Sequence, residues 1–131
     1  MASVFSRIVS GELPAFRLAE TEGYLAFLDI NPMTEGHTLV IPKVEVDNIF
    51  DLEQDDYVGL FIFVKEISKA IAKSVVCARI GMAVVGFDVP HAHVHLVPMN
   101  HISDMDFGRD KLKMDEKALE SLAKIIRNKI G

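Results

Sequence analysis

The sequence predicts an α+β fold, an antiparallel sheet of about five strands with one long helix and a C-terminal helix packed against it. Short β-rich runs separated by turn residues indicate the strands, and two longer segments have the apolar spacing of helices. The chain has 131 residues, of which 50% are hydrophobic and 25% are charged, so it can bury one packed core. We therefore expect a single domain over residues 1–131.

The N-terminal part of the chain predicts a short helix and three strands. Ser3 is a suitable cap for a helix that ends near Val9. The segments 15–20 and 24–28 are separated by turn residues and predict a hairpin. A β-rich run over 37–41, stopped by a proline, predicts the third strand.

A long helix is expected in the middle of the chain, and its apolar surface predicts contact with a second subunit. Asp51, followed three residues later by a glutamine, has the spacing of a capping box, and the helix should end near Val75. Apolar residues over 57–64 cover most of the helix circumference, so this half needs burial on two sides. Phe61 and Phe63 would leave a large apolar patch on a monomer, which predicts a homodimer.

The C-terminal part predicts two more strands and a last helix. The runs 79–85 and 91–97 are β-rich and are separated by a break that contains glycine and proline. Asp115 is expected to cap the final helix. One face of that helix carries four apolar residues, Leu119, Leu122, Ile125 and Ile126.

Charge and cysteine content restrict the class of protein. The formal net charge of −5 disfavours a nucleic-acid partner, because such binding relies on a basic surface. A single cysteine, Cys77, cannot form a disulfide within the chain, and the N-terminus lacks the apolar stretch of a signal peptide. The longest nearly apolar run, 57–64, is far shorter than the roughly 20 residues that cross a bilayer. We expect a cytoplasmic protein without a membrane partner.

Three of the five histidines lie at alternate positions in one predicted strand. His91, His93 and His95 should therefore face the same side of the sheet. They can be surface imidazoles, ligands of a metal, or catalytic groups. Rings two residues apart can share one zinc, but His91 and His95 are roughly 13 Å apart in a strand. A metal would need further ligands, for which Asp88 and His37 are the nearest candidates.

Nucleophilic catalysis is the third interpretation of this cluster. An imidazole nitrogen that attacks phosphorus must be neutral, needs a group that fixes its tautomer, and needs donors for the phosphoryl oxygens. His93 is the central ring, with another histidine on each side, so it is the best candidate for the nucleophile.

The segment His91-Ala92-His93-Val94-His95-Leu96-Val97 resembles the His-x-His-x-His-x-x signature of the histidine triad family of nucleotide hydrolases and transferases. Upstream similarity covers Phe5, Ile8 and three blocks in the order that the family has. The blocks are Gly11-Glu12-Leu13-Pro14, Ala26-Phe27-Leu28-Asp29-Ile30-Asn31-Pro32 and Gly36-His37-Thr38-Leu39-Val40-Ile41-Pro42-Lys43. The resemblance covers residues 3–98 and implies the histidine triad fold. The extension 99–131 carries no family motif.

The resemblance implies a role for each matching residue. His93 matches the nucleophile that forms a nucleotidyl-histidine intermediate, and His95 matches the residue that contacts the phosphate. His91 and His37 match a pair that supports the central ring, and Asp29 matches the carboxylate that binds the ribose hydroxyls. The matches to the apolar nucleobase pocket are Phe5, Ile8, Phe27 and Ile30.

Several positions depart from the family pattern. Many bacterial members bind zinc through an N-terminal Cys-x-x-Cys and a later histidine, where this chain has Ser3, Ser6 and Glu45, so we expect no metal and no other cofactor. Before the triad, Phe87 and Asp88 replace Gln and a hydroxyl residue that contact the phosphate or leaving group. Lys43 is the only cation found near the motifs.

The predicted function is hydrolysis at the α-phosphorus of a purine nucleoside phosphoramidate or a related nucleotide. Polyphosphate substrates bring several negative charges, which need cationic partners that an acidic protein offers poorly. Two alternatives stay open at this point. One is a nucleotide-binding regulatory or scaffold protein with negligible turnover, and the other is a dinucleoside polyphosphate hydrolase.

Overall fold

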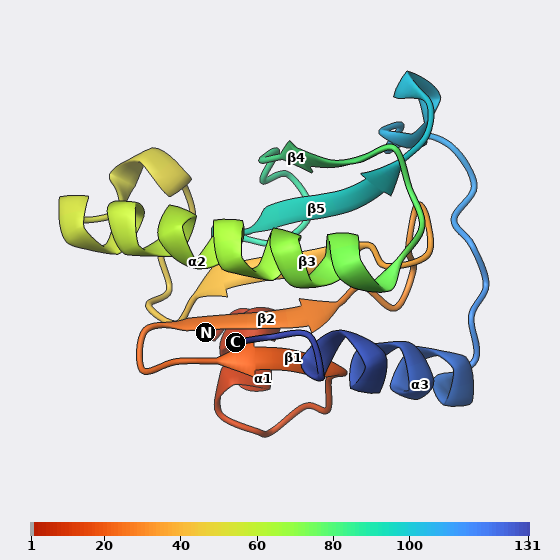
Figure 1. The fold of residues 1–131 in the computed structure, drawn as a ribbon. Helices are drawn as coiled ribbons and strands as arrows, with labels where there is room; N and C mark the ends of the chain where they lie inside the picture. The colour runs from red at the N-terminus through yellow and green to blue at the C-terminus, as the bar shows by residue number, and fades with distance from the viewer. Residues whose placement is uncertain (1) are drawn as a thin grey trace.

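The computed structural model describes residues 2–131 and contains one five-stranded antiparallel sheet with helices on both faces (Figure 1). Along the sheet the strand order is β1-β2-β3-β5-β4. The strands are β1 Arg17–Glu20, β2 Tyr24–Leu28, β3 Thr38–Pro42, β4 Arg79–Ala83 and β5 Val94–Met99. The helices are α1 Val4–Val9, α2 Gln54–Ser74 and α3 Glu116–Arg127, with short 3-10 turns η1 Ile49–Asp51 and η2 Ile102–Asp104. The predicted fold class is confirmed.

Two apolar clusters cover the two faces of the sheet. The larger contains strand residues such as Val40, Val94 and Leu96 together with the buried sides of α2 and α3. On the opposite face, Phe5 and Ile8 of α1 pack against apolar residues of β2 and β3. Figure 1 accordingly places α2 and α3 on one side of the sheet and α1 on the other.

Capping explains where two of the helices begin. Ser3 accepts a hydrogen bond from the backbone N–H of Ser6 at the start of α1, and Asp115 accepts one from Ala118 at the start of α3, as predicted. The predicted capping box at Asp51 is wrong. Asp51 ends η1, and α2 begins at Gln54 after Glu53, whose side chain makes no capping bond.

The strand that carries the histidines begins later than predicted. β5 begins at Val94, because the backbone N–H of Ala92 donates to Val46 and that of His91 donates to Val89, outside the sheet. The predicted alternation nevertheless persists, since Ala92, Val94 and Leu96 all pack in the α2-side cluster. The facing strand β3 pairs Leu39 with His95 and so brings the end of the preceding loop to the histidines.

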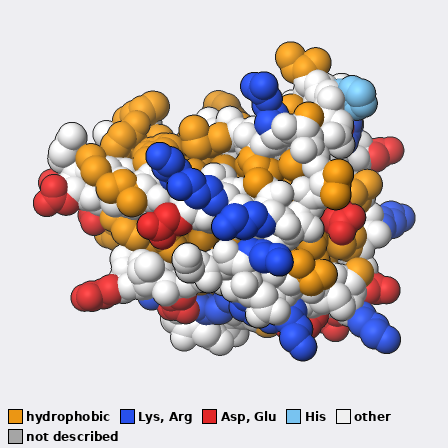
Figure 2. Space-filling model, viewed as in Figure 1, with side chains coloured by type: hydrophobic (Ala, Val, Ile, Leu, Met, Phe, Trp, Pro, Cys, Tyr) orange, Lys and Arg blue, Asp and Glu red, His pale blue; other side chains and the backbone are white. Residues whose placement is uncertain are grey.

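The apolar surface of the long helix differs in detail from the prediction. Phe63 is buried in the chain's own core and does not form part of a patch, whereas Val58 and Ile62 are 45% and 60% exposed. Figure 2 shows apolar side chains gathered over the end of the molecule where η1 and the first half of α2 lie. Ile125 of α3 was expected on the buried face but is 48% exposed. Over residues 2–131, no helix has the length and apolarity to span a bilayer.

Candidate active site

Four histidines meet on the α1 side of the sheet, and all are buried. His91 and His93 lie in the segment that leads into β5, His95 lies within β5, and His37 directly precedes β3. In space, the ring of His95 lies between two others. Its centroid is 4.9 Å from that of His93 and 5.2 Å from that of His37. The predicted grouping of His91, His93 and His95 is therefore present, with His37 beside it.

One ring nitrogen of His93 is hydrogen-bonded, and the other has no hydrogen-bond partner. Its Nδ1 lies 2.7 Å from the carbonyl oxygen of His91, and because a carbonyl only accepts, Nδ1 carries the proton. In the neutral ring Nε2 then holds a lone pair. Among residues 2–131, Nε2 is the one buried side-chain polar atom without a hydrogen-bond partner. Asp88 Oδ1 lies 3.2 Å from it but lacks hydrogen-bond geometry, so the carboxylate covers the free nitrogen without satisfying it.

His37 supports His95 and not His93, contrary to what the resemblance implied. The backbone N–H of Met33 donates to His37 Nδ1 over 3.0 Å, so the His37 proton is on Nε2. That N–H in turn donates to His95 Nδ1 over 2.9 Å. The neutral His95 ring must then carry its own proton on Nε2, where it is a hydrogen-bond donor.

Burial keeps the supporting histidines neutral. Loss of hydration lowers the pKa of His37 to about 3 and that of His95 to about 4, and it also lowers the pKa of His91. Neighbouring imidazoles make a smaller contribution in the same direction, which these pKa values include. The site thus combines a free lone pair on His93 with a neutral N–H donor on His95, which suits attack on phosphorus and contact with a phosphoryl oxygen.

Asp29 lies beside His37, at the end of β2. Its Oδ1 accepts a hydrogen bond of 2.8 Å from the backbone N–H of Asn31, and its Oδ2 is 3.6 Å from His37 Nε2. Burial raises the pKa of this carboxyl, an effect that the Asn31 hydrogen bond partly offsets. The remaining acceptor capacity of Asp29 is compatible with hydroxyl groups of a ligand.

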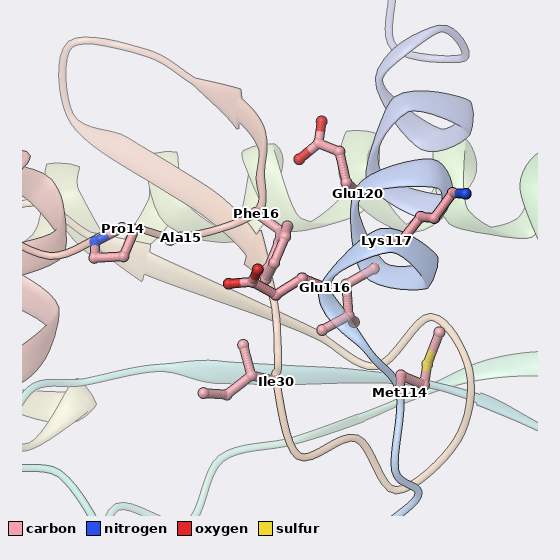
Figure 3. Close-up of a pocket in the computed structure, with 9 residues that line it drawn as sticks. Pro14, Ala15, Phe16, Ile30, Met114, Glu116, Lys117 and Glu120 are labelled. Carbon is pink, nitrogen blue, oxygen red and sulfur yellow. The ribbon is translucent and has the colours of Figure 1, made fainter.

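The four residues matched to a nucleobase pocket differ in their burial. Phe5, Ile8 and Phe27 are buried together, and the Phe5 ring contacts both Phe27 and His93 edge-on, with centroids 5.6 Å and 5.0 Å apart. Ile30 is 60% exposed. It lines a cavity of about 850 Å³ between the start of β1 and α3, where Figure 3 shows it beside Phe16 and Glu116.

Two groups in the site have ligand atoms close enough together for a metal ion. One consists of Asp29, His37 and His95, and the other of Asp88, His93 and His95. In the first group the His37–His95 hydrogen bond occupies one nitrogen of each ring. In the second, only the lone pair of His93 Nε2 is free on an imidazole, because the tautomer of His95 places a proton on its Nε2. Neither group is a preformed set of free ligands.

Ser3, Ser6 and Glu45, which replace the zinc ligands of some relatives, lie together next to His91. The backbone N–H of Ser3 and the hydroxyl of Ser6 donate to Glu45 and lower the pKa of its carboxyl to about 2. These polar groups therefore satisfy one another and His91 through hydrogen bonds.

Sequence reasoning missed the segment between β5 and α3. The ring of Phe107 contacts that of His95 edge-on, with centroids 4.9 Å apart. Lys111 is close enough to lower the pKa of both Asp29 and His37, and its ammonium donates to the carbonyls of Phe107 and Arg109. No spacing or motif marks these residues. Lys43, the cation expected near the site, instead pairs with Glu20 over 2.6 Å.

Comparison with known proteins finds one family that matches most of the chain. The family model described as "HIT domain" matches residues 10–102. Adenosine 5'-monophosphoramidase hnt1 of Schizosaccharomyces pombe is 33% identical over 133 aligned positions, which cover 99% of each chain. The protein hit of Bacillus subtilis is 34% identical over 72% of this chain and 69% of its own.

Solved structures show the same fold. A Hit-like protein from Bartonella henselae superposes with a TM-score of 0.85 at 28% identity, covering 98% of this chain and 96% of its own. A zinc-bound histidine triad family protein from Mycobacterium smegmatis has a TM-score of 0.83 at 31% identity, covering 98% and 93%. With the domain match extending over most of the chain and the four histidines assembled, this chain belongs to the HIT, or histidine triad, family.

Proposed function

We propose that the protein hydrolyses purine nucleoside phosphoramidates, or related nucleotides, at the α-phosphorus through a nucleotidyl-histidine intermediate on His93. The observation that carries this proposal is the state of His93, with Nδ1–H donated to the His91 carbonyl and a buried Nε2 lacking a partner. A lone pair held in a fixed tautomer is what a nucleophilic imidazole needs. The name of the S. pombe relative supports the substrate class.

The reaction has two displacements at the same phosphorus. His93 Nε2 forms a bond to the α-phosphorus, the phosphorus–nitrogen bond of the substrate breaks, and the amine leaves with a proton taken up from the surroundings. Water then attacks, the Nε2–phosphorus bond breaks, a proton is released, and a nucleoside monophosphate and the neutral ring remain. The Nε2–H of His95 would donate to a phosphoryl oxygen in both steps, since His37 holds its Nδ1.

The contacts to the ribose, to the nucleobase and between two copies are proposed from the positions of the residues in the fold. Asp29 would accept the ribose hydroxyls, and the apolar group of Phe5, Ile8 and Phe27 would contact the nucleobase, with Ile30 at the outer edge. The exposed face of α2 and the open edge of β4 would join two copies into a homodimer. Because Ser3, Ser6 and Glu45 are hydrogen-bonded among themselves and to His91, we propose that this place holds no zinc.

Asp88 favours a second candidate, a nucleotide-binding regulatory or scaffold protein with negligible turnover. Its carboxylate lies 3.2 Å from the attacking nitrogen, where it would repel an anionic phosphate. In this alternative the site binds a nucleotide but rarely brings the phosphorus to His93. Turnover measured with enzyme in stoichiometric amount separates slow catalysis from none.

The choice of leaving group is tested by comparing substrates. The site contains Asp29 and Asp88, and Lys111 is the cation that acts on it, so a substrate with one negative charge should be favoured over a polyphosphate. We expect a higher kcat/KM for an adenosine phosphoramidate than for diadenosine tetraphosphate, both with and without magnesium. A higher value for the polyphosphate under both conditions would contradict the charge argument and support a dinucleoside polyphosphate hydrolase.

A further inference from the structure

A polar cluster beside the His91 ring connects α1 to the segment before β5. We call Ser3, Ser6 and Glu45, together with their hydrogen bonds to one another and to the His91 ring, the α1 bracket. Ser3 Oγ lies 2.8 Å from His91 Nδ1. Glu45 Oε1 accepts two hydrogen bonds of 2.6 Å, one from the backbone N–H of Ser3 and one from the Ser6 hydroxyl. The contacts join three separate parts of the chain, α1, the loop after β3 and the triad segment.

The positions of the protons in the α1 bracket follow from its partners. His91 Nε2 lies 2.8 Å from the carbonyl of Pro42, which only accepts, so Nε2 carries the proton and Nδ1 of the neutral ring is an acceptor. The Ser3 hydroxyl must therefore donate to Nδ1. Its oxygen in turn accepts from the backbone N–H of Ser6. The Ser6 hydroxyl donates to Glu45 over 2.6 Å and lies farther, 3.4 Å, from His91 Nδ1, so Ser3 is the nearer donor to the His91 ring.

The α1 bracket reaches His93 through the main chain of His91. With the His91 ring held at both nitrogens and its backbone N–H donated to Val89 over 2.8 Å, its carbonyl oxygen has a fixed position. That oxygen accepts the Nδ1–H of His93 over 2.7 Å. Phe5, two residues after Ser3, also packs edge-on against both His91 and His93, with centroids 5.8 Å and 5.0 Å apart. The bracket thus determines two neighbours of the His93 ring.

We propose that Ser3, Ser6 and Glu45 are positioning residues that hold His91 so that its carbonyl keeps the His93 proton on Nδ1 and leaves Nε2 free. The effect on catalysis rests on the proposed role of His93 as nucleophile. The effect on the tautomer of His93 is independent of that role, because it concerns only the hydrogen bonds of the folded protein.

The test uses the full chain with four single substitutions. Ser3→Ala removes the donor to His91, and Ser3→Thr restores a hydroxyl. Ser6→Ala keeps the Ser3 hydroxyl as donor and cap and removes one donor to Glu45. Ser10→Ala is the matched control, since the exposed Ser10 hydroxyl bonds to the carbonyl of Arg7 at the other end of α1. Turnover of an adenosine phosphoramidate, the nitrogen resonances of the histidine rings by NMR, and the Tm are measured for each.

We expect Ser3→Ala to lower kcat by about 10- to 100-fold, the range found when a group that orients a catalytic residue is lost. KM should change much less, and the NMR signal of the His93 Nδ1–H tautomer should weaken. Ser3→Thr should restore both, Ser6→Ala should show a smaller loss of kcat, and Ser10→Ala should match the wild type. Loss of the cap at Ser3 should lower the Tm only slightly, because a single cap is a small part of the stability of a domain of this size.

The opposite pattern overturns the proposal. If Ser3→Ala and Ser6→Ala lower the Tm but leave kcat and the His93 resonances as in the wild type, the α1 bracket only stabilises the fold. If Ser3→Ala does not fold, Ser6→Ala tests the proposal. Wild-type kcat and wild-type His93 resonances in Ser6→Ala would then overturn it. If Ser3→Ala shifts the His93 tautomer while His93→Asn retains turnover, the positioning stands and the nucleophile assignment fails.

Discussion

At the scale of single residues, Asp88 is the side chain whose position most affects the proposed chemistry. It stands 3.2 Å from the free nitrogen of His93, at a position where the family pattern has a neutral hydroxyl. An anionic phosphate that approaches this nitrogen therefore meets a negative charge. The carboxylate is 66% exposed, so water screens the repulsion and its energy is about 1 kcal/mol at 4 Å.

We expect Asp88→Ser to raise kcat/KM for an adenosine phosphoramidate by roughly five-fold, which corresponds to that repulsion. Most of the gain should lie in KM, because the charge opposes binding of the phosphate. Glu66→Gln is the control, since it removes an exposed carboxylate from α2 on the other face of the sheet. A fall of kcat/KM in Asp88→Ser would show that the carboxylate assists the reaction.

The buried histidines predict how stability depends on pH. His37 and His95 remain neutral in the folded protein because burial lowers their pKa values to about 3 and about 4, whereas in the unfolded chain they titrate near 6.5. Below pH 6.5 the unfolded chain therefore binds protons that the folded protein does not. The contribution of these two histidines to the free energy of unfolding is fully retained above this pH. It decreases as the pH falls, by about 1.4 kcal/mol per pH unit for each extra proton that the unfolded chain binds.

Urea unfolding between about pH 7 and pH 5 measures this slope. His37→Asn should reduce the slope by about one proton, because it removes one of the two imidazoles that stay neutral in the folded protein. The raised pKa of Asp29 has the opposite effect on stability. An equal slope in wild type and His37→Asn would contradict the neutral state of His37.

At the scale of secondary structure elements, the sequence predicted which elements form better than where they begin. Periodicity and turn residues located three helices and five strands in order, since these patterns reflect burial on one face. The start of β5 was missed because the residues before it pair with a loop more than forty positions away, through the Ala92–Val46 hydrogen bond. The cap of α2 was missed because Asp51 belongs to a short 3-10 turn that local spacing does not reveal.

We predict that the exposed side of α2 forms the interface between two copies of the chain. Ile62→Lys should produce a monomer, because a lysine at this position would bury an unpaired charge between two copies. The monomer should keep its fold, since Ile62 is 60% exposed in a single chain. Analytical ultracentrifugation at micromolar concentration measures the change.

Ile125→Lys provides the matched control for the interface. Ile125 is a second exposed isoleucine, on α3, and its replacement should leave the wild-type mass in solution unchanged. A wild-type protein that sediments as a monomer would contradict the predicted homodimer. So would an Ile62→Lys variant that sediments as the wild type does.

At the scale of the whole molecule, the site is formed by segments that lie far apart in the sequence. The histidine motif located His91, His93 and His95, and the alternation of a strand placed them on one face. That His37 would bond to His95 could not be predicted, because this contact depends on the register between β3 and β5. Phe107 and Lys111 were missed because they reach the site from a segment without regular structure or a motif.

The central claim is that His93 is the nucleophile, and turnover of an adenosine phosphoramidate by His93→Asn tests it most directly. His101→Asn serves as the control for loss of an imidazole, and circular dichroism checks the fold of both variants. We expect the loss of several orders of magnitude in kcat for His93→Asn, and wild-type turnover for His101→Asn, because the first removes the attacking nitrogen and the second an exposed ring. Retention of more than about a tenth of wild-type turnover by a folded His93→Asn protein would contradict the claim, since removing a nucleophile costs far more than that.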